Sequence, residues 1–271
     1  MKKGQGIRAG TKEGRWITAV ATAMVLGALT MLTWSWLTGP VTAAPTAPSE
    51  PPVIALTFDD GPSPEYTPKI LALLTRYHAH ATFFVLGSEV ARFPKIAREI
   101  VQQGSVLANH GYDHVNFFQV GVRGVLRDLE RANRLLAQER LPATPFYRPP
   151  FGNANAALVR ALNQRGYTVA LWSIDTRDWA RPGAAFITRR VLSEAKPGAI
   201  ILMHDSGGNR ADTVNALAAI LPVLESEGYQ LVTLPEYVRR LHLHTPTELP
   251  LKPAKPRSAP PPAPSPAGPW T

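Results

Sequence analysis

Residues 56–62 read Leu56-Thr57-Phe58-Asp59-Asp60-Gly61-Pro62, an apolar run that ends in two adjacent carboxylates and a turn. Two acidic side chains at the mouth of a buried strand lose hydration unless a metal ion or a proton-transfer task holds them there. Because Gly61-Pro62 ends the extended backbone, both carboxylates can face one cavity at the C-terminal end of the strand, where α/β proteins place their chemistry. A solvated turn is the alternative for such a pair on its own.

Strand-like and helix-like segments alternate along the rest of the chain. Strands are predicted at 53–58, 81–86, 105–109, 145–148, 168–173, 199–204 and 230–233. Helices are predicted at 68–78, 88–103, 122–140, 154–164, 184–195, 213–227 and 235–241. This alternation predicts an α/β fold with a parallel sheet covered by helices, either open or closed into a barrel.

The chain has 271 residues and 45% apolar content, enough for one globular domain, which we place at 53–245. The segments 39–52 and 246–271 are rich in Pro, Ala, Ser and Thr, and we expect a linker and a disordered tail. There is no cysteine, so a metal ion would have to take histidine and carboxylate ligands.

An uncharged stretch of 21 residues, 17–37, would span roughly 31 Å as a helix, close to the hydrocarbon thickness of a bilayer. The basic flank at 1–15 predicts a cytoplasmic N-terminus. We therefore predict a transmembrane anchor at 16–38 and a single-pass protein of the cell membrane whose globular domain is extracellular. A signal peptide cleaved after Val41-Thr42-Ala43 is the alternative, and the domain would then be secreted.

The formal net charge of +9 does not indicate a nucleic-acid partner. The N-terminal flank contributes +4 and the tail from 246 contributes +2, which leaves only +3 for the globular part. That excess suits an acidic cell-envelope surface, and the sequence contains no basic aromatic pattern of the kind that binds RNA.

Four more polar clusters follow predicted strands: NHGYDH at 109–114, YRPPFG at 147–152, DTRDW at 175–179 and IILMHD at 200–205. His110 and His114 are four residues apart and can bind one metal ion together with Asp60. Taken singly, each cluster has a structural alternative, such as a pair of surface histidines or a rigid Arg-Pro turn. Five clusters at the ends of five strands favour one shared site.

With TFDDG at 57–61, these clusters resemble the five motifs of the carbohydrate esterase family 4 polysaccharide deacetylases, also called the NodB homology domain. The resemblance spans about 53–241. It implies a distorted (β/α)7 barrel and a metal-dependent hydrolase that removes N-acetyl groups from a polysaccharide. It also implies one divalent ion, usually zinc, with cobalt, manganese or nickel as alternatives. The implied metal ligands are Asp60, His110 and His114.

The other roles also carry over by resemblance. Asp59 resembles the catalytic base that takes a proton from metal-bound water, and Arg148 the residue that orients it. His204 resembles the general acid that protonates the leaving amine, and Asp178 its tuning partner. The remaining implied site residues, which bind substrate, are Phe151 (through its backbone N–H in the oxyanion hole), Trp179 and Leu202.

One departure from the family pattern concerns Gly111, which stands where a hydroxyl side chain usually supports the loop between the two histidines. We therefore expect a looser metal loop.

The exported domain and its linker favour N-acetylglucosamine of peptidoglycan as the substrate. We also expect the protein to be a monomer. Chitin oligomers, N-acetylmuramic acid, poly-N-acetylglucosamine and acetylxylan are alternatives. A protein of another class, a non-catalytic glycan-binding protein on the same fold, would be expected to lack Asp59, Arg148 or His204.

Overall fold

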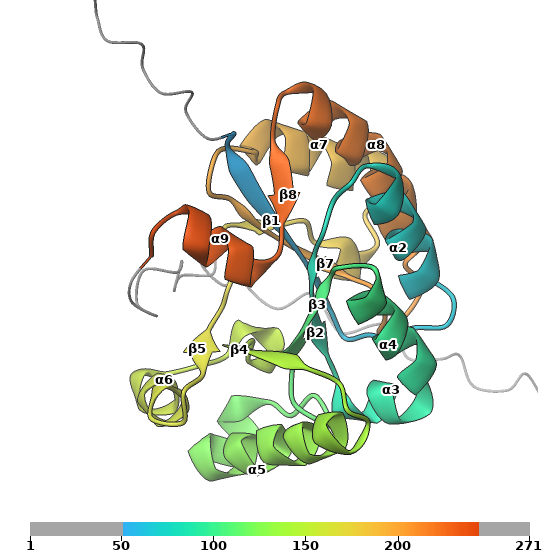
Figure 1. The fold of residues 1–271 in the computed structure, drawn as a ribbon. Coiled ribbons are helices and arrows are strands. Elements are labelled where there is room, and N and C mark those ends of the chain that lie inside the picture. Colours follow the sequence, from blue (N-terminus) through green and yellow to red (C-terminus); the bar gives the residue numbers. More distant parts are fainter. Residues whose placement is uncertain (1–50, 244–271) are drawn as a thin grey trace, which may run out of the picture. The chain divides into compact units, whose positions relative to one another are not determined.

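The computed structural model describes residues 51–243 (Figure 1). The strands are β1 (Val53–Asp59), β2 (Thr82–Val85), β3 (Val106–Asn109), β4 (Ala143–Tyr147), β5 (Thr168–Val169), β6 (Ile174–Asp175), β7 (Ile200–His204) and β8 (Gln230–Val232). The helices are α2 (Thr67–Arg76), α3 (Gly87–Arg92), α4 (Pro94–Gln102), α5 (Phe117–Gln138), α6 (Ala156–Asn163), α7 (Ala184–Glu194), α8 (Ala211–Ser226) and α9 (Leu234–Arg240), with short 3-10 turns at Pro150–Gly152 and Asp178–Ala180.

All pairs in the sheet are parallel, in the order β5-β4-β3-β2-β1-β7-β6. Strand β1 is central: β7 runs along one of its edges, while β2 and β8 share the other edge at opposite ends of the strand. Every residue of β1 is buried. The predicted α/β fold with a parallel sheet is confirmed, and the arrangement is consistent with a distorted (β/α)7 barrel.

Two predicted elements differ in the structure. Of the predicted strand 168–173 only Thr168–Val169 is a strand, β5, which pairs with β4; the next strand, β6, begins at Ile174, beyond the predicted range, and pairs with β7 on the other side of the sheet. The predicted helix 88–103 becomes α3 and α4, separated at Phe93, because Pro94 has no N–H to continue a helix and restricts the residue before it. The prediction of single elements was wrong at these two places.

Residues 170–173 connect β5 and β6, the two edge strands of the sheet, and form a seam between them. The Ala170 N–H donates to the Tyr147 carbonyl of β4 at 3.0 Å where the segment leaves β5, and the Ser173 N–H donates to the Ile200 carbonyl of β7 at 2.9 Å just before β6. Within this seam the Arg148 guanidinium donates to the carbonyls of Ala170 and Leu171, both at 3.0 Å. A buried cation thus satisfies backbone carbonyls that no strand ladder reaches.

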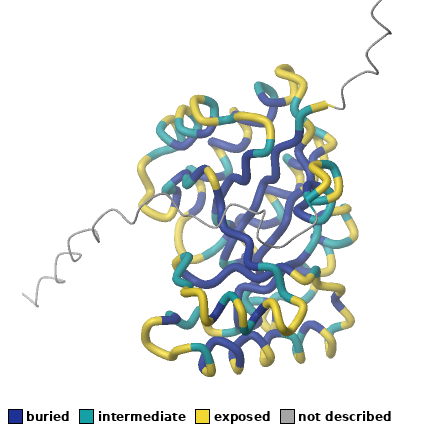
Figure 2. Tube along the Cα trace, turned by 90° about the vertical axis from the view of Figure 1, so that its left-hand side faces the viewer, coloured by how far each residue is buried: buried dark blue, intermediate teal, exposed yellow. Residues whose placement is uncertain are grey.

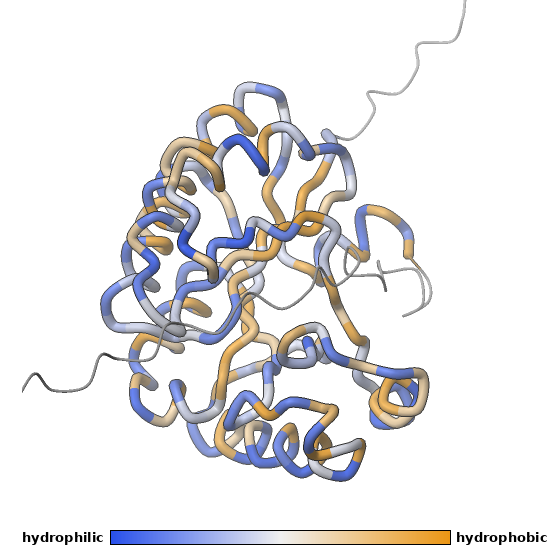
Figure 3. The backbone as a smooth tube through the Cα atoms, turned by 180° about the vertical axis from the view of Figure 1, so that it is seen from behind, coloured by the Kyte–Doolittle hydropathy of each residue, from blue (hydrophilic) through white to orange (hydrophobic). Residues whose placement is uncertain are grey.

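Side chains of the strands alternate between two apolar cores. Ile54, Leu56 and Phe58 of β1 pack in the core shared with α2, α4, α7 and α8. Val53 and Ala55 pack in the core shared with α5 and α6. In Figure 2 the buried strands lie at the centre of the domain. In Figure 3 the helices around them show alternating hydrophobic and hydrophilic residues.

Within residues 51–243 no helix has both the length and the apolar character needed to cross a membrane. The predicted anchor at 16–38 lies outside the described residues, as do the flank at 1–15, the tail at 246–271 and nearly all of the linker at 39–52.

Candidate active site

A cavity of about 530 Å³ opens at the C-terminal ends of the strands. Eight of the ten predicted site residues line it: Asp59, Asp60, His110, His114, Phe151, Trp179, Leu202 and His204. The other two lie directly behind the lining, since Arg148 contacts Asp59 and Asp178 contacts His204. The structure therefore brings all ten predicted residues to one place.

Strand alternation explains why three of these side chains point inward. Asp59 follows Ala55 and Thr57 at every second position of β1. His204 follows Ile200 and Leu202 in the same way along β7, and His110 follows Ala108 of β3. Because Ala55, Ala108, Ile200 and Leu202 all belong to one core, the polar residues that continue their rows reach the same cavity.

Asp60, His110 and His114 form the candidate metal site, with one ligand atom from each lying within 4.8 Å of the others. Asp60 Oδ1 lies 3.5 Å from His110 Nε2 and 3.3 Å from His114 Nε2. The His110 Nδ1 lies 2.7 Å from the Arg148 carbonyl, which fixes Nδ1 as the protonated nitrogen and leaves Nε2 free to bind a metal.

These residues fit a divalent ion. Asp60 Oδ1 is buried and has no hydrogen-bond partner among the described residues, which is costly for a carboxylate oxygen unless a cation binds it. Nitrogen and oxygen ligands about 2.0–2.1 Å from a tetrahedral ion lie about 3.3–3.4 Å apart, close to the observed spacings. Three protein ligands also leave a coordination position open, as in catalytic sites.

The pKa shifts of Asp60 and His114 also favour the protonation states that bind a metal ion. Burial raises the pKa of the Asp60 carboxyl, but His110, His204 and His114 lower it more, so the net pKa is well below its ordinary value. Burial lowers the pKa of His114, and His110 lowers it further, against the opposing charges of Asp60 and Asp59. An ionised carboxylate and a neutral imidazole are the forms that bind metal.

The loop between the two histidines is held by Asp128 of α5. Its carboxylate accepts hydrogen bonds from the backbone N–H groups of Tyr112 at 2.8 Å and Asp113 at 3.1 Å. The Asn109 side chain accepts a third, from the Gly111 N–H, at 2.7 Å. Any side chain at Gly111, whose φ is +88°, would come within 2.3 Å of the Asp128 carboxylate. Asp128 and Asn109 therefore supply hydrogen bonds to the loop in place of a hydroxyl side chain at position 111.

Arg148 is completely buried and binds Asp59. Its Nη1 donates to Asp59 Oδ1 at 2.7 Å and to the Thr57 hydroxyl at 2.8 Å. Burial lowers the pKa of Arg148 more than the adjacent Asp59 raises it, so the net pKa is below its ordinary value. With Oδ1 engaged in this way, Asp59 Oδ2 faces the metal site, 3.8 Å from His110 Nε2.

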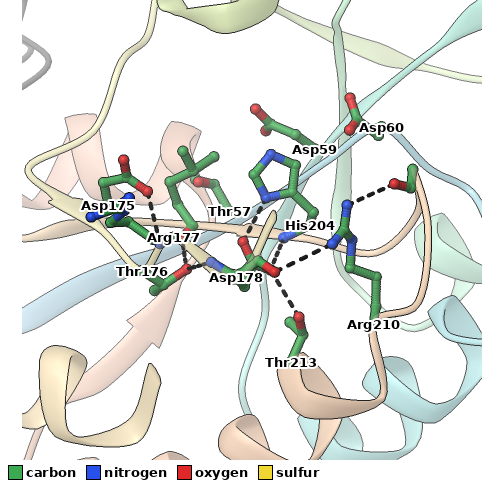
Figure 4. A network of polar contacts seen from close by, with 12 residues as sticks. Thr57, Asp59, Asp60, Asp175, Thr176, Arg177, Asp178, His204, Arg210 and Thr213 are labelled. Atoms are coloured by element: carbon green, nitrogen blue, oxygen red, sulfur yellow. Dashed lines mark hydrogen bonds and ion pairs between the residues drawn. The ribbon is translucent and has the colours of Figure 1, made fainter. Parts of the chain in front are cut away.

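On the opposite wall, Asp178 binds His204 (Figure 4). Asp178 Oδ1 lies 2.7 Å from His204 Nδ1, and Oδ2 accepts from the His204 backbone N–H at 2.8 Å and from the Thr213 hydroxyl at 2.9 Å. Burial lowers the pKa of His204, but Asp178 above all, with Asp60 and Asp59, raises it to about 9. Burial raises the pKa of Asp178, but His204 lowers it more, so Asp178 stays ionised and His204 is protonated at neutral pH.

The turn after the paired carboxylates packs against Asp205, which is completely buried. The Thr67 hydroxyl donates to Asp205 Oδ2 at 2.5 Å, and the Asp205 N–H donates to the Asp59 carbonyl at 3.2 Å. Burial raises the pKa of Asp205 to about 7, with an opposing effect of Thr67. A Cβ atom at Gly61 would lie 2.2 Å from Asp205 Oδ2, so only glycine fits in this turn.

Several residues of the site were missed by sequence reasoning. Arg210, at the start of α8, lines the cavity and donates to the Asp178 carbonyl at 3.3 Å. Gly207 has a φ of +73°, and a side chain there would lie 2.8 Å from Asp60 Oδ2. The Gly207-Gly208 pair next to the IILMHD cluster was a possible signal for close backbone approach, whereas nothing in the local sequence marks Arg210 or Asp128.

Comparison with known proteins agrees with this geometry. Residues 46–170 match the family described as Polysaccharide deacetylase. A peptidoglycan-N-acetylglucosamine deacetylase of Bacillus cereus is 39% identical over 198 residues, which cover 72% of this chain and 92% of the relative. A chitooligosaccharide deacetylase of Rhizobium leguminosarum bv. trifolii is 36% identical, with 68% and 90% covered.

The solved structure of the peptidoglycan deacetylase PdaC from Bacillus subtilis superposes with a TM-score of 0.67 at 34% identity, covering 72% of this chain and 94% of that one. The sequence similarity extends over nearly the full length of these relatives. On this evidence, the chain belongs to the polysaccharide deacetylase family.

Proposed function

We propose that this protein is a metal-dependent deacetylase that removes N-acetyl groups from the N-acetylglucosamine residues of peptidoglycan. One observation carries the proposal: the Asp60-His110-His114 triad lies between an Arg-bound carboxylate and a carboxylate-bound histidine in a single cavity. A non-catalytic glycan-binding protein would have no use for either pair. The Bacillus cereus relative, named for this activity, supports the choice of substrate.

Amide hydrolysis needs a stronger nucleophile than water and a stabilised oxyanion. When bound by Asp60, His110 and His114, a divalent ion polarises a carbonyl and lowers the pKa of water. Asp59 is the base: Arg148 holds its Oδ1, and Oδ2 is left to take one proton from the attacking water. We assign the oxyanion contact to the backbone N–H of Phe151 on the cavity rim.

Departure of the sugar amine requires a proton, and His204 supplies it. The Asp178 carboxylate keeps the His204 ring charged and fixes its orientation. As the C–N bond breaks, the nitrogen takes the proton from His204 Nε2, and the products are acetate and a free amine. Trp179 and Leu202 line the cavity where the acetyl methyl group would lie.

We assign zinc as the metal. One carboxylate oxygen and two imidazole nitrogens at these spacings suit tetrahedral zinc, and the absence of cysteine is compatible with a nitrogen and oxygen ligand set. Cobalt, manganese and nickel accept the same ligands, so the metal content of the purified protein would test the assignment.

The activity test is acetate release from purified peptidoglycan, from chitin oligomers and from acetylxylan, each with and without a chelator. We expect chelator-sensitive release that is fastest with peptidoglycan. The chitooligosaccharide deacetylase among the relatives makes chitin oligomers the second candidate substrate. Glycan binding by the folded, metal-loaded domain without acetate release from any substrate would refute the enzyme proposal.

We also propose that residues 16–38 anchor the protein in the cell membrane as a single span, with a monomeric catalytic domain outside the cytoplasm. The uncharged stretch at 17–37 and the basic flank before it support this. Fractionation of cells into membrane and medium tests the anchor, because signal cleavage would release the domain. Light scattering of the purified domain tests the monomer.

A further inference from the structure

Five large apolar side chains are exposed among residues 51–243, and two of them line the cavity. Phe151 and Trp179, which line the cavity, are 60% and 40% exposed. Phe118 and Val120, in the first turn of α5, are 73% and 38% exposed. Neither residue of this turn belongs to a sequence motif or lines the cavity. Exposed apolar patches of this kind mark ligand-binding surfaces.

The Phe118 turn is tied to the loop that carries Phe151. The Asn116 Oδ1 accepts hydrogen bonds from the Phe118 N–H at 3.0 Å and from Asn153 Nδ2 at 3.3 Å, so both nitrogens meet at one oxygen. Asn153 is two residues after Phe151, whose ring packs edge-on against that of His114, with centroids 4.6 Å apart. A continuous set of short contacts therefore leads from the metal site across the rim to Phe118.

The Phe118 ring is positioned by its own neighbours. Phe117 is buried in the core and lies next to Phe118, with ring centroids 5.3 Å apart and a tilt of 58°. The first turn of α5 is separated from the rest of the helix by Gly121, which has a φ of +63° and ψ of −177°. The turn thus has its own direction, and within it one aromatic ring faces the core and the next faces solvent.

We infer that Phe118, with Val120, forms a subsite for a sugar ring next to the residue that is deacetylated. The inference rests on the proposed function, because a polysaccharide must leave the cavity over its rim. A pyranose ring has an apolar C–H face that can stack on an aromatic ring while its hydroxyl groups stay hydrated. The side-chain amides of Asn116 and Asn153, which are hydrogen-bonded to each other, have a further donor and a further acceptor to offer those hydroxyls.

The test compares kcat/KM for N-acetylglucosamine itself with that for its oligomers from the dimer to the hexamer. In Phe118→Ala the ratio of hexamer to monomer should fall by about three- to tenfold, the effect of losing one stacked ring. Phe118→Tyr keeps the ring and should keep the ratio. The control is Leu241→Ala, which truncates another exposed apolar residue, 37% exposed, outside the cavity lining. That control should leave the ratio at the wild-type value.

Binding separates this inference from the proposed function. Titration calorimetry of hexamer binding should show the same three- to tenfold weakening in Phe118→Ala whether or not acetate is released. If no oligomer is hydrolysed but this weakening is found, the function fails and the subsite stands. A length dependence and a hexamer affinity that are both unchanged in Phe118→Ala would overturn the subsite. An equal loss with every substrate, the monosaccharide included, would overturn it as well, because it would indicate a structural role.

Discussion

The pairing of Asp178 with His204 predicts a shift in pH dependence when the carboxylate is removed. Asp178→Asn keeps the size and shape of the side chain but removes the charge that lies 2.7 Å from His204 Nδ1. Since Asp178 is the strongest factor raising the pKa of His204, the burial that lowers it should then dominate, against the remaining charges of Asp60 and Asp59. We expect His204 in the variant to titrate near or below its ordinary value.

The size of the effect follows from the pKa of His204. It is raised from 6.5 to about 9, which corresponds to about 3 kcal/mol in favour of the protonated ring. A general acid works only when protonated, so wild-type activity should fall above about pH 9, and that of the variant above about pH 6.5. The variant should therefore be slower by about tenfold at about pH 7.5 and by close to a hundredfold at about pH 8.5. A cation bound by Asp60, His110 and His114 would affect the wild type and Asp178→Asn alike, so the direction of the shift in pH dependence would stay the same.

The assay is the pH dependence of kcat for acetate release, with the His204 ring titrated by NMR in parallel. Asp175→Asn is the matched control, because it also removes a carboxylate that lines the cavity. The Asp175 carboxylate accepts a hydrogen bond from the Arg177 N–H and does not bind His204. The control should keep the wild-type basic limb. If Asp178→Asn slows the enzyme by the same factor at every pH, the carboxylate does not act through the pKa of His204 and the reasoning is refuted.

Three further predictions concern the residues around the metal. Asp59→Asn should lower kcat by about a hundredfold or more while metal stays near stoichiometric by elemental analysis, and loss of the metal would mean that Asp59 is a ligand. Asp128→Ala should weaken metal binding about 10- to 100-fold in competition with a chelator, because the loop loses two hydrogen bonds; unchanged affinity would deny Asp128 this role. Gly61→Ala should lower the free energy of unfolding by about 1–3 kcal/mol in urea titration, since its Cβ would overlap Asp205, and an unchanged midpoint would contradict the packing described here.

The sequence was informative about the site because each functional side chain lies within a few residues of a buried strand. Runs such as 56–62 and 200–205 predict both the strand and the polar residue that follows it. Parallel strands end at one edge, so the residues meet without any need to know the order of the strands. The sheet itself was predicted for the same reason, since β1 and β7 are continuous apolar runs.

The features that were missed depend on contacts between distant segments. Asp128 is one of several charged residues in α5, and only the packing of α5 on the metal loop distinguishes it. Arg210, just before α8, likewise contacts the site only because its side chain reaches back to the Asp178 carbonyl. The end of β5 at Val169 and the start of β6 at Ile174 follow from pairing with two different neighbours, which a local apolar pattern does not encode.

The position of Arg148 in the seam between β5 and β6 has a consequence for the evolution of this family. The same guanidinium satisfies two carbonyls of the seam and holds the oxygen of Asp59. Replacement of Arg148 would remove catalytic activity and also leave buried carbonyls without donors, at a cost of about 1–3 kcal/mol each. A descendant that abandons catalysis can change Asp59 or His204 more cheaply than Arg148. We therefore expect Arg148 to be retained in inactive members longer than the residues it serves.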